Sequence, residues 1–256
     1  RLAVILSGIS MPHISIAAEE ILTLGRLTLT NTFVASWLVT GLLIVGAYAL
    51  SRRLQLVPAG AQNAFEIVVE TFLGMMEGIF GSRRRAEQYL PIILTLFLFI
   101  IASNWFGILP GVGSLGFFAH EHGKEVFVPF LRSAASDLNV TLALGLVAMT
   151  LVNVSGVSAL GWLAHLRKFF SFTSPIQFFV GILELLSEFA KIISFSFRLF
   201  GNVFAGEVLL VIVGSLAPFG APVPFLLLEV FVGFIQALVF AMLTMVFISI
   251  AVAEHH

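Results

Sequence analysis

The sequence contains no cysteine. Disulfide bonds, thiolate metal sites and thiol nucleophiles are therefore excluded. None of the six histidines forms the His-x3-His spacing that would place two metal ligands on one helix face; they stand at positions 13, 120, 122, 165, 255 and 256. We accordingly expect no metal site and no cofactor.

Charge is also scarce. Charged residues make up 11% of the chain, against about a quarter of an ordinary soluble domain. Hydrophobic residues make up 59%, and the mean hydropathy is +1.07, which is typical of a polytopic membrane protein. The formal net charge of −1 offers no basic surface, so nucleic-acid binding is not expected.

Signatures of several other classes are missing. The chain has no His-Glu-x-x-His zinc motif, no Gly-x-Ser-x-Gly elbow and no paired aspartate motif, which argues against an intramembrane enzyme. It shows no internal repeat, which many secondary transporters carry. A stand-alone ion channel or transporter subunit remains the main alternative function, and a passive membrane anchor is a weaker one.

What the chain does contain is a series of long apolar runs. They predict an all-α polytopic membrane protein, a single domain over residues 1–256, with about five membrane-embedded helices at 32–50, 89–109, 138–163, 175–215 and 223–253. Three basic clusters contain the residues Arg52 and Arg53, Arg83 to Arg85, and Arg167 with Lys168. Because cytoplasmic loops carry the excess of Lys and Arg, we place these clusters inside. The 1–31 segment, the 111–137 loop and the N-terminus then lie outside, and the C-terminus lies inside.

The segment 58–80 has basic residues at both ends on the same side, so it should not cross the membrane. Its glutamates Glu66, Glu70 and Glu77 fall within about 40° of one another on a helical wheel. We therefore predict an amphipathic helix on the inner membrane surface. The alternative is an ordinary span whose glutamates face protein.

The last two apolar tracts are too long for a simple crossing. A hydrocarbon core about 30 Å thick needs about 20 helical residues, whereas the tract 175–215 would be roughly 60 Å long as one helix. Either these helices break or they lie steeply inclined in the membrane. We favour a steeply tilted antiparallel hairpin, which would present a broad lateral surface to a partner.

The tract 175–215 also carries many ionisable groups for a membrane helix. One polar stripe contains Glu184, Glu188, Lys191, Arg198 and Asn202. Intramembrane charges are costly and usually mark an ion or substrate path. The structural alternatives are a salt bridge between Glu188 and Lys191, spaced i, i+3, and a bidentate pair of Arg198 with a carboxylate.

Four sequence stretches resemble one known family. "RLFGNVFAGE", followed by a Pro-rich turn and "FIQALVFAMLTMVFISIA", closely resembles subunit a of F-type ATP synthases. "SRRLQLVPAGAQNAFE", "SNWFGILPG" and "SDLNVTLALGL" resemble earlier segments of the same family, so the likeness runs from about residue 30 to the end. By this resemblance Arg198 is the family's essential arginine and Asn202 is the asparagine four residues after it. Glu207 is the carboxylate nine residues after it, and Gln236 is the glutamine of the last helix. The chain departs from the family at Glu229, where bacterial relatives often have histidine.

The resemblance implies a stator subunit that couples proton flow to rotation of a ring of c subunits, each with one membrane carboxylate. Expected partners are that ring, the peripheral-stalk b subunits, the rest of the FoF1 complex and membrane lipid. We expect the bacterial inner membrane as the location, and no ATP chemistry by the isolated chain. The choice between proton and sodium depends mainly on the ring.

The predicted topology separates two half-channels on either side of Arg198. The outer one is assigned Glu207 and Glu229, joined by Asp137 and Asn139 at the outer start of the fourth predicted span. The inner one is assigned Glu184 with Glu188, because Glu184 lies roughly 21 Å from Arg198 along a helix. Ser194, Asn202 and Gln236 are expected as polar neighbours of the arginine.

Overall fold

The computed structural model describes residues 19–24, 27–52, 54–109, 111–112, 116–121, 124–169, 174–217 and 220–253. Most of them are helical, and the predicted all-α polytopic class is confirmed. The helices are α2 (Asn31–Ser51), α3 (Ala61–Phe80), α4 (Arg83–Ile108), α5 (Leu138–Leu160), α6 (Trp162–Phe169), α7 (Pro175–Leu216) and α8 (Pro222–Val252).

Five helices in the described part are long and apolar enough to cross a membrane, namely α2, α4, α5, α7 and α8. They correspond to the five predicted ranges. The largest difference is at the start of α4, which begins at Arg83 rather than at residue 89, so the basic cluster is its first turn. The prediction began where the apolar run begins, but a helix continues through charged residues as long as its backbone hydrogen bonds continue.

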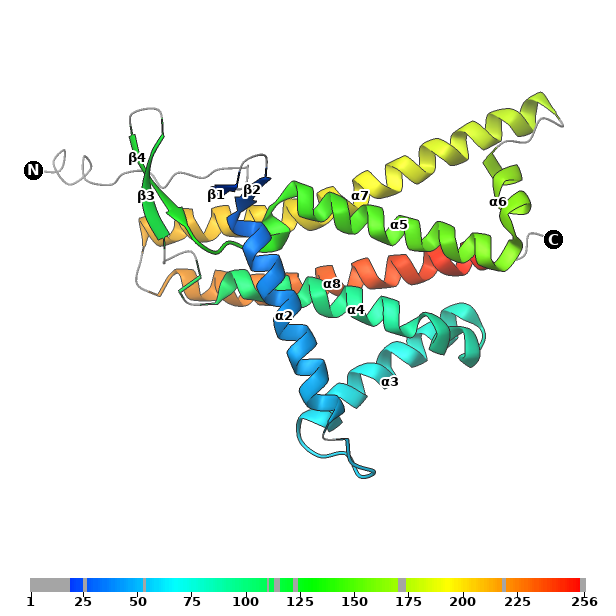
Figure 1. The fold of residues 1–256 in the computed structure, drawn as a ribbon, viewed down its shortest axis with the longest axis horizontal. Helices are drawn as coiled ribbons and strands as arrows, with labels where there is room; N and C mark the ends of the chain where they lie inside the picture. The colour runs from blue at the N-terminus through cyan, green and yellow to red at the C-terminus, as the bar shows by residue number, and fades with distance from the viewer. Residues whose placement is uncertain are drawn as a thin grey trace, which may run out of the picture.

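Four of these helices, α4, α5, α7 and α8, run roughly alongside one another, and α2 crosses them at a steep angle (Figure 1). The helix α8 lies at the centre, packed against α4, α5 and α7. Half of its most apolar window is buried, against 11% of the corresponding window in α7. The core between the helices includes Phe195, Leu199, Phe240 and Met245. One broad side of α7 is therefore left uncovered by the described residues.

The helices α7 and α8 form the predicted antiparallel hairpin. Each begins at a proline, Pro175 and Pro222, which suits a first helical turn because proline lacks the backbone N–H that is unbonded there. Gly220, with φ of 82°, lies in the turn between them. The alternative of a broken tract is wrong, since α7 is one helix of 42 residues. Its inclination to a membrane stays a prediction.

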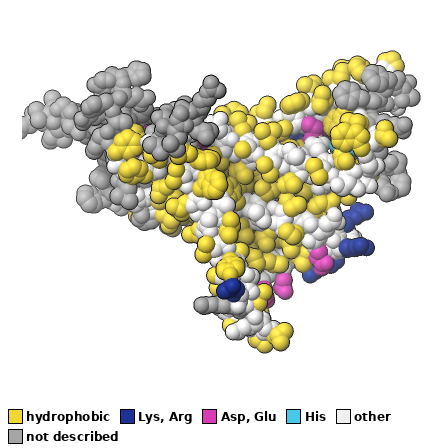
Figure 2. All heavy atoms as spheres, in the orientation of Figure 1, with side chains coloured by type: hydrophobic (Ala, Val, Ile, Leu, Met, Phe, Trp, Pro, Cys, Tyr) yellow, Lys and Arg dark blue, Asp and Glu magenta, His cyan; other side chains and the backbone are white. Residues whose placement is uncertain are grey.

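The helix α3 packs along α4 through one apolar face, which includes Phe72, Leu73 and Met76, while Glu70 and Glu77 are exposed. The predicted amphipathic helix is thus present, three residues shorter at its start. Figure 2 shows hydrophobic side chains over most of this view of the molecule, with charged ones gathered near the turn between α3 and α4. There Arg83 lies 3.4 Å from Glu77 and 3.1 Å from Glu87. The position of α3 at a membrane surface stays a prediction.

In the described part of the chain, two β-hairpins, the 3-10 helix η1 (Ala134–Ser136) and the short helix α6 were not predicted. Two antiparallel hairpins, β1 (Glu20–Leu24) with β2 (Leu27–Thr30) and β3 (Gly116–Glu121) with β4 (Lys124–Pro129), lie at the same end as the α7–α8 turn (Figure 1). They fall within the segment 1–31, which was predicted as an N-terminal outer segment, and within 111–137, which was predicted as an outer loop. The helix α6 follows α5, which ends at Leu160 although the prediction extended this span to residue 163. Gly161, with φ of 85°, redirects the chain between the two helices.

Candidate functional site

Arg198 lies on the uncovered side of α7. Phe195, Leu199 and Val203 repeat at helical spacing and are buried against the rest of the chain. Arg198 points away from this buried stripe and is exposed. Its Nη2 donates to Ser194 Oγ at 3.4 Å. Among the described residues Arg198 makes no ion pair with a carboxylate. For the alternative, a structural pair of Arg198 with a carboxylate of its own chain, the described residues therefore provide no carboxylate.

The next turn of α7 connects the exposed face with the interior of the hairpin. Asn202 Nδ2 donates to Gln236 Oε1 at 2.8 Å, and Gln236 is only 4% exposed. The second hydrogen-bonding atom of that amide, Gln236 Nε2, has no partner among the described residues. The structure thus contains two separate contacts among the four expected residues, Arg198 with Ser194 and Asn202 with Gln236. That all four act together stays a prediction.

Glu229 lies on α8 against α7 at Gly206. A Cβ atom added to Gly206 would lie 2.6 Å from Glu229 Oε1, so the glycine leaves the space that the carboxylate occupies. Glu229 Oε2 is buried without a hydrogen-bond partner among the described residues. Glu207 directly follows Gly206 in α7. Both predicted outer carboxylates therefore lie on the same part of the hairpin.

A small crevice joins this carboxylate to the polar pair near the arginine. Its lining comes from α4, α7 and α8 and consists of Asn104, Ile108, Asn202, Val203, Glu229, Val232, Gly233 and Gln236. Polar atoms from three helices thus converge where the hairpin meets α4. Asn104 and the neighbouring Trp105 were not predicted as site residues, although they belong to the stretch "SNWFGILPG" that supports the family resemblance.

These two α4 side chains hold α8 in place. Asn104 Nδ2 donates to the carbonyl of Gly233 at 3.0 Å, and Trp105 Nε1 donates to the carbonyl of Val230 at 3.1 Å. Asn104 Oδ1 is buried without a partner among the described residues. The amide therefore presents a free acceptor at the crevice that also holds Glu229.

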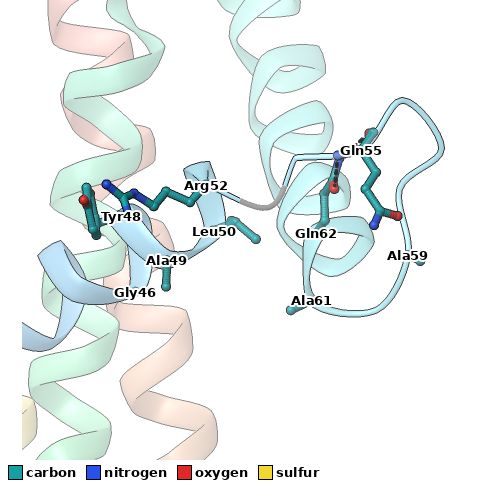
Figure 3. Close-up of a pocket in the computed structure, with 9 residues that line it drawn as sticks. All are labelled: Gly46, Tyr48, Ala49, Leu50, Arg52, Gln55, Ala59, Ala61 and Gln62. Atoms are coloured by element: carbon teal, nitrogen blue, oxygen red, sulfur yellow. Dashed lines mark hydrogen bonds between the residues drawn. The ribbon is translucent and has the colours of Figure 1, made fainter.

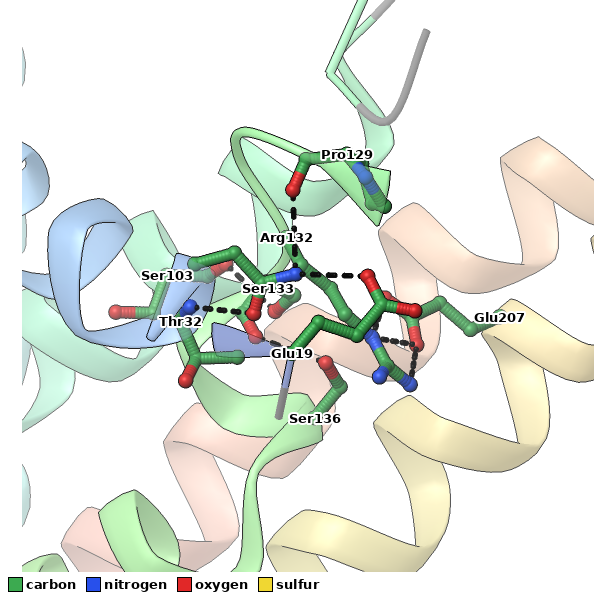
Figure 4. Close-up of polar contacts among 9 residues, drawn as sticks. Glu19, Thr32, Ser103, Pro129, Arg132, Ser133, Ser136 and Glu207 are labelled. Carbon is green, nitrogen blue, oxygen red and sulfur yellow. Dashed lines mark hydrogen bonds and ion pairs between the residues drawn. The ribbon is translucent and has the colours of Figure 1, made fainter. Parts of the chain in front are cut away.

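Glu207 has a strong partner that sequence reasoning missed. Arg132, in the loop after β4, donates from Nε to both carboxylate oxygens, at 3.3 and 3.0 Å, and from Nη2 to Oε2 at 2.8 Å (Figure 4). The two side chains are 11% and 27% exposed. The sequence marks Arg132 only as a cation in an outer loop, and no local pattern joins it to a residue 75 positions away.

Asp137 and Asn139 occupy structural positions at the start of α5. Asp137 is buried, accepts from the backbone N–H of Asn139 at 2.8 Å as the helix cap, and accepts from Thr32 Oγ1 at 2.8 Å. In the described part of the chain its hydrogen bonds thus go to these residues and not to Glu207 or Glu229. The Asp137 carboxylate ties the start of α5 to the start of α2.

The predicted inner carboxylates are each bonded to a lysine. Glu184 Oε1 lies 2.7 Å from Lys168 Nζ, and Glu188 Oε1 lies 2.7 Å from Lys191 Nζ. The alternative of a Glu188–Lys191 salt bridge is therefore confirmed. Next to it is a groove of about 440 Å³ between α5, α6 and α7. Two polar residues that line it, Asn153 and His165, were not singled out from the sequence.

A second groove, of about 740 Å³, lies apart from Arg198, between the end of α2 and the start of α3 (Figure 3). The Arg52 guanidinium lies 4.7 Å from the centre of the Tyr48 ring, and Gln62 bonds the backbone of Gln55 at both N and O. These polar groups satisfy one another. In the ranges that the structure describes, no three His, Asp or Glu side chains are grouped so that they could hold a metal ion.

Comparison with known proteins agrees with this arrangement. The family model "ATP synthase A chain" matches residues 33–249. "ATP synthase subunit a" of Moorella thermoacetica is 34% identical over 92% of this chain and 97% of its own length. The proteins of that name from Campylobacter concisus and Geobacter sp. strain M21 are each 32% identical, over 85% and 88% of this chain and 88% and 89% of their own lengths. With five apolar helices, the chain is a multi-pass membrane protein that belongs to the subunit a family of ATP synthases.

Proposed function

We propose that this chain is the proton-translocating stator subunit of an F-type ATP synthase, and that it couples proton flow to rotation of a ring of c subunits. The observation that carries this proposal is the position of Arg198. It projects from the uncovered side of α7, and no carboxylate of the described residues neutralises it. A charge kept in such a helix without an internal partner suits a partner from outside the chain.

The chemistry of arginine suits this task. Its guanidinium stays protonated, with a pKa above about 12, so it cannot pass a proton on. It attracts a deprotonated carboxylate on a passing ring subunit and releases it because desolvation offsets much of the attraction. It also repels protons and so blocks a direct leak, which would waste about 2.3 kcal/mol per proton at 100 mV.

The surface around Arg198 suits close contact with a helix of the ring. The exposed residues on this side of α7 include Ala190, Ser194, Gly201 and Ala205, and small side chains let membrane helices approach closely. A Cβ at Gly201 would meet nothing within 4 Å in this chain. We assign this side of α7 to the ring, and the remaining surfaces to the b subunits, the rest of the complex and lipid.

The outer half-channel runs past Glu207 and Glu229 to the crevice at Asn202 and Gln236. Its support is that Glu229, Asn202 and Gln236 line one crevice, near the end that holds the β-hairpins. Glu207 follows Gly206, against which Glu229 packs. Asp137 and Asn139 border this end as structural residues. The inner half-channel runs past Glu188 and Glu184, toward the opposite end of α7.

The arrangement of the helices supports an inclined hairpin. The 21 residues of α2 would span about 31 Å, which matches a hydrocarbon core of about 30 Å. If α2 stands along the membrane normal, the helices that it crosses at a steep angle, α7 and α8 among them, lie inclined (Figure 1). The basic clusters then place the N-terminus outside and the C-terminus inside. We assign the bacterial inner membrane, and the ATP chemistry to other subunits.

The test is Arg198→Lys in the complete complex, with Arg52→Lys as the matched control because Arg52 stacks on Tyr48 away from α7. We expect Arg198→Lys to abolish ATP synthesis driven by a proton gradient in membrane vesicles, while the ring and the ATPase head still copurify. Normal synthesis by Arg198→Lys would overturn the proposal. Ion conduction by the purified chain alone would instead favour a stand-alone channel.

A further inference from the structure

The short helix α6 is fitted between α5 and α7 at two glycines. A Cβ on Gly156 of α5 would lie 3.0 Å from both Cε1 and Nδ1 of His165. A Cβ on Gly181 of α7 would overlap the backbone carbonyl of Phe169, the last residue of α6. A side chain at Gly181 would require the backbone of α6 to shift, and one at Gly156 would crowd the ring of His165. The two glycines thus leave space on both neighbouring helices for this short helix.

A chain of hydrogen bonds leads from α6 to an inner carboxylate. His165 Nε2 lies 3.0 Å from Asn153 Oδ1. Asn153 Nδ2 donates to the carbonyl of Met149 at 2.9 Å and to Glu188 Oε2 at 3.3 Å. The other oxygen of Glu188 accepts from Lys191 at 2.7 Å. Both oxygens of this carboxylate are therefore held, one by the amide and one by the lysine.

The same network decides which ring nitrogen of His165 carries hydrogen. The NH₂ group of Asn153 faces two acceptors, so its oxygen must face His165. An oxygen can only accept, so His165 Nε2 must donate. In the neutral ring Nδ1 is then without hydrogen, and it is the atom that lies against Gly156. Protonation at this position would add a charged donor where α6 meets α5.

His165 is only 7% exposed and has charged neighbours on two helices. Burial, followed by the charge of Lys168, lowers the pKa of His165, and the charge of Glu188 opposes them. The helix α7 contributes Glu184, Glu188 and Lys191, whereas α5 contributes only uncharged side chains. Next to Gly156 the helix α8 offers the backbone carbonyl of Ala251, and residues 254–256 lie outside the described residues.

This network opens onto a groove. His165, Asn153 and Glu188 all line the groove of about 440 Å³, together with the hydroxyl-bearing Thr150 and Ser158. The groove lies at the end of α7 that the proposed function assigns to the inner half-channel. A proton donor or acceptor in the inner solution can therefore act on the ring.

We propose that His165, acting through Asn153, is a positioning residue for Glu188 that makes the inner half-channel respond to pH on the inner side. With His165 neutral, Asn153 holds Glu188 in place and protons pass. When the inner side becomes acidic, His165 gains a proton at Nδ1, the new charge adds to those of Lys168 and Lys191, and α6 is loosened from Gly156. Proton passage then slows. This inference rests on the proposed function because it concerns regulation of the same path.

The test uses the complete complex in vesicles with the ATPase head facing the medium, so that the pH of the inner side is set directly. Proton pumping per ATP hydrolysed is measured from pH 5 to 8, which removes the pH dependence of the head itself. The wild type should lose pumping only below about pH 6.5, the ordinary pKa of histidine, because burial lowers the pKa of His165. His165→Gln keeps a donor for Asn153 but cannot gain a proton, so it should lack this loss and stay within about twofold of wild type at pH 8.

Two further variants separate positioning from assembly. Lys168→Gln removes a charge that lowers the pKa of His165, so the acid loss should move to higher pH. Asn153→Ala should slow pumping about tenfold at every pH, because Glu188 loses a charge-assisted hydrogen bond. His120→Gln, on β3 at the other end of the molecule, is the matched control.

An acid loss that is unchanged in both His165→Gln and Lys168→Gln would overturn the inference. Arg198→Lys is measured in the same vesicles. If Arg198→Lys abolishes coupling while the histidine variant keeps the acid loss, the proposed function stands and only this inference fails. If Arg198→Lys pumps normally, the proposed function fails first.

Discussion

Arg132 and Glu207 form a bidentate ion pair across 75 positions of the chain, with Nη2 2.8 Å from Oε2 and Nε 3.3 Å from Oε1. The pair joins the loop after β4 to α7. The helix α7, little of whose most apolar stretch is buried, is therefore held by a loop at Glu207. The same contact sets the direction in which one outer carboxylate of the proposed proton path points.

We predict that Arg132→Gln slows ATP-driven proton pumping, because a partly buried carboxylate loses its cation and its orientation. Glu207→Gln should also slow pumping, and the double variant should lose less than the sum of the two. A double-mutant cycle on pumping rates should give a coupling of about 1–3 kcal/mol. A coupling near zero would show that the pair has no role in translocation.

Gly206→Ala should impair pumping, because the new Cβ would lie 2.6 Å from Glu229 Oε1. Glu229→Gln should not relieve the defect, since glutamine has nearly the same shape. Glu229→Gly should relieve the collision, although it removes the carboxylate. Gly214→Ala is the control on the same helix, because a Cβ there meets nothing within 4 Å. Equal pumping by the two alanine variants would contradict the prediction.

Glu207→Gln and Glu229→Gln should each slow proton passage, and their effects should not add, because Glu229 packs against Gly206, the residue next to Glu207. The measurement is the rate of proton uptake by vesicles at fixed ATP hydrolysis for both single variants and the double variant. Strict additivity would mean that the two groups do not share a site.

Asp137→Ala should destabilise the chain by about 1–3 kcal/mol, since the helix cap of α5 and the bond to Thr32 are both lost. Asp137→Asn keeps an acceptor oxygen for the cap and should recover part of this stability. Thermal unfolding of the purified complex measures the loss. Pumping by Asp137→Asn at the wild-type rate would indicate a structural role. A loss of pumping with unchanged stability would favour a place in the half-channel.

Much of the fold could be predicted from composition and hydropathy. The five apolar runs predicted α2, α4, α5, α7 and α8, because in a membrane only a helix of sufficient apolar length satisfies its own backbone. The boundaries were less accurate. Gly161 ends α5 early and Arg83 begins α4 early, since hydropathy records the side chains whereas the helix depends on backbone hydrogen bonds.

The candidate site was predicted in part. Arg198, Glu207 and Glu229 stand out from the sequence because a charge in an apolar run is costly and therefore conspicuous. Arg132, Asn153 and His165 do not stand out. Arg132 lies in a loop, Asn153 lies in a run of uncharged residues, and His165 lies beside the basic pair Arg167 and Lys168. Only the fold shows which carboxylate each of them serves.

The sequence alone therefore determined the class of protein, the number of long helices and the unusual charge at Arg198, since these follow from residue types along one helix or run. The tertiary structure decided the partners: Arg132 for Glu207, Gly206 for Glu229, and Asn153 for Glu188. Each partner lies on a different segment from the group that it meets. Their encounter depends on how helices pack against one another, and that information is spread over the whole core rather than carried by a local pattern.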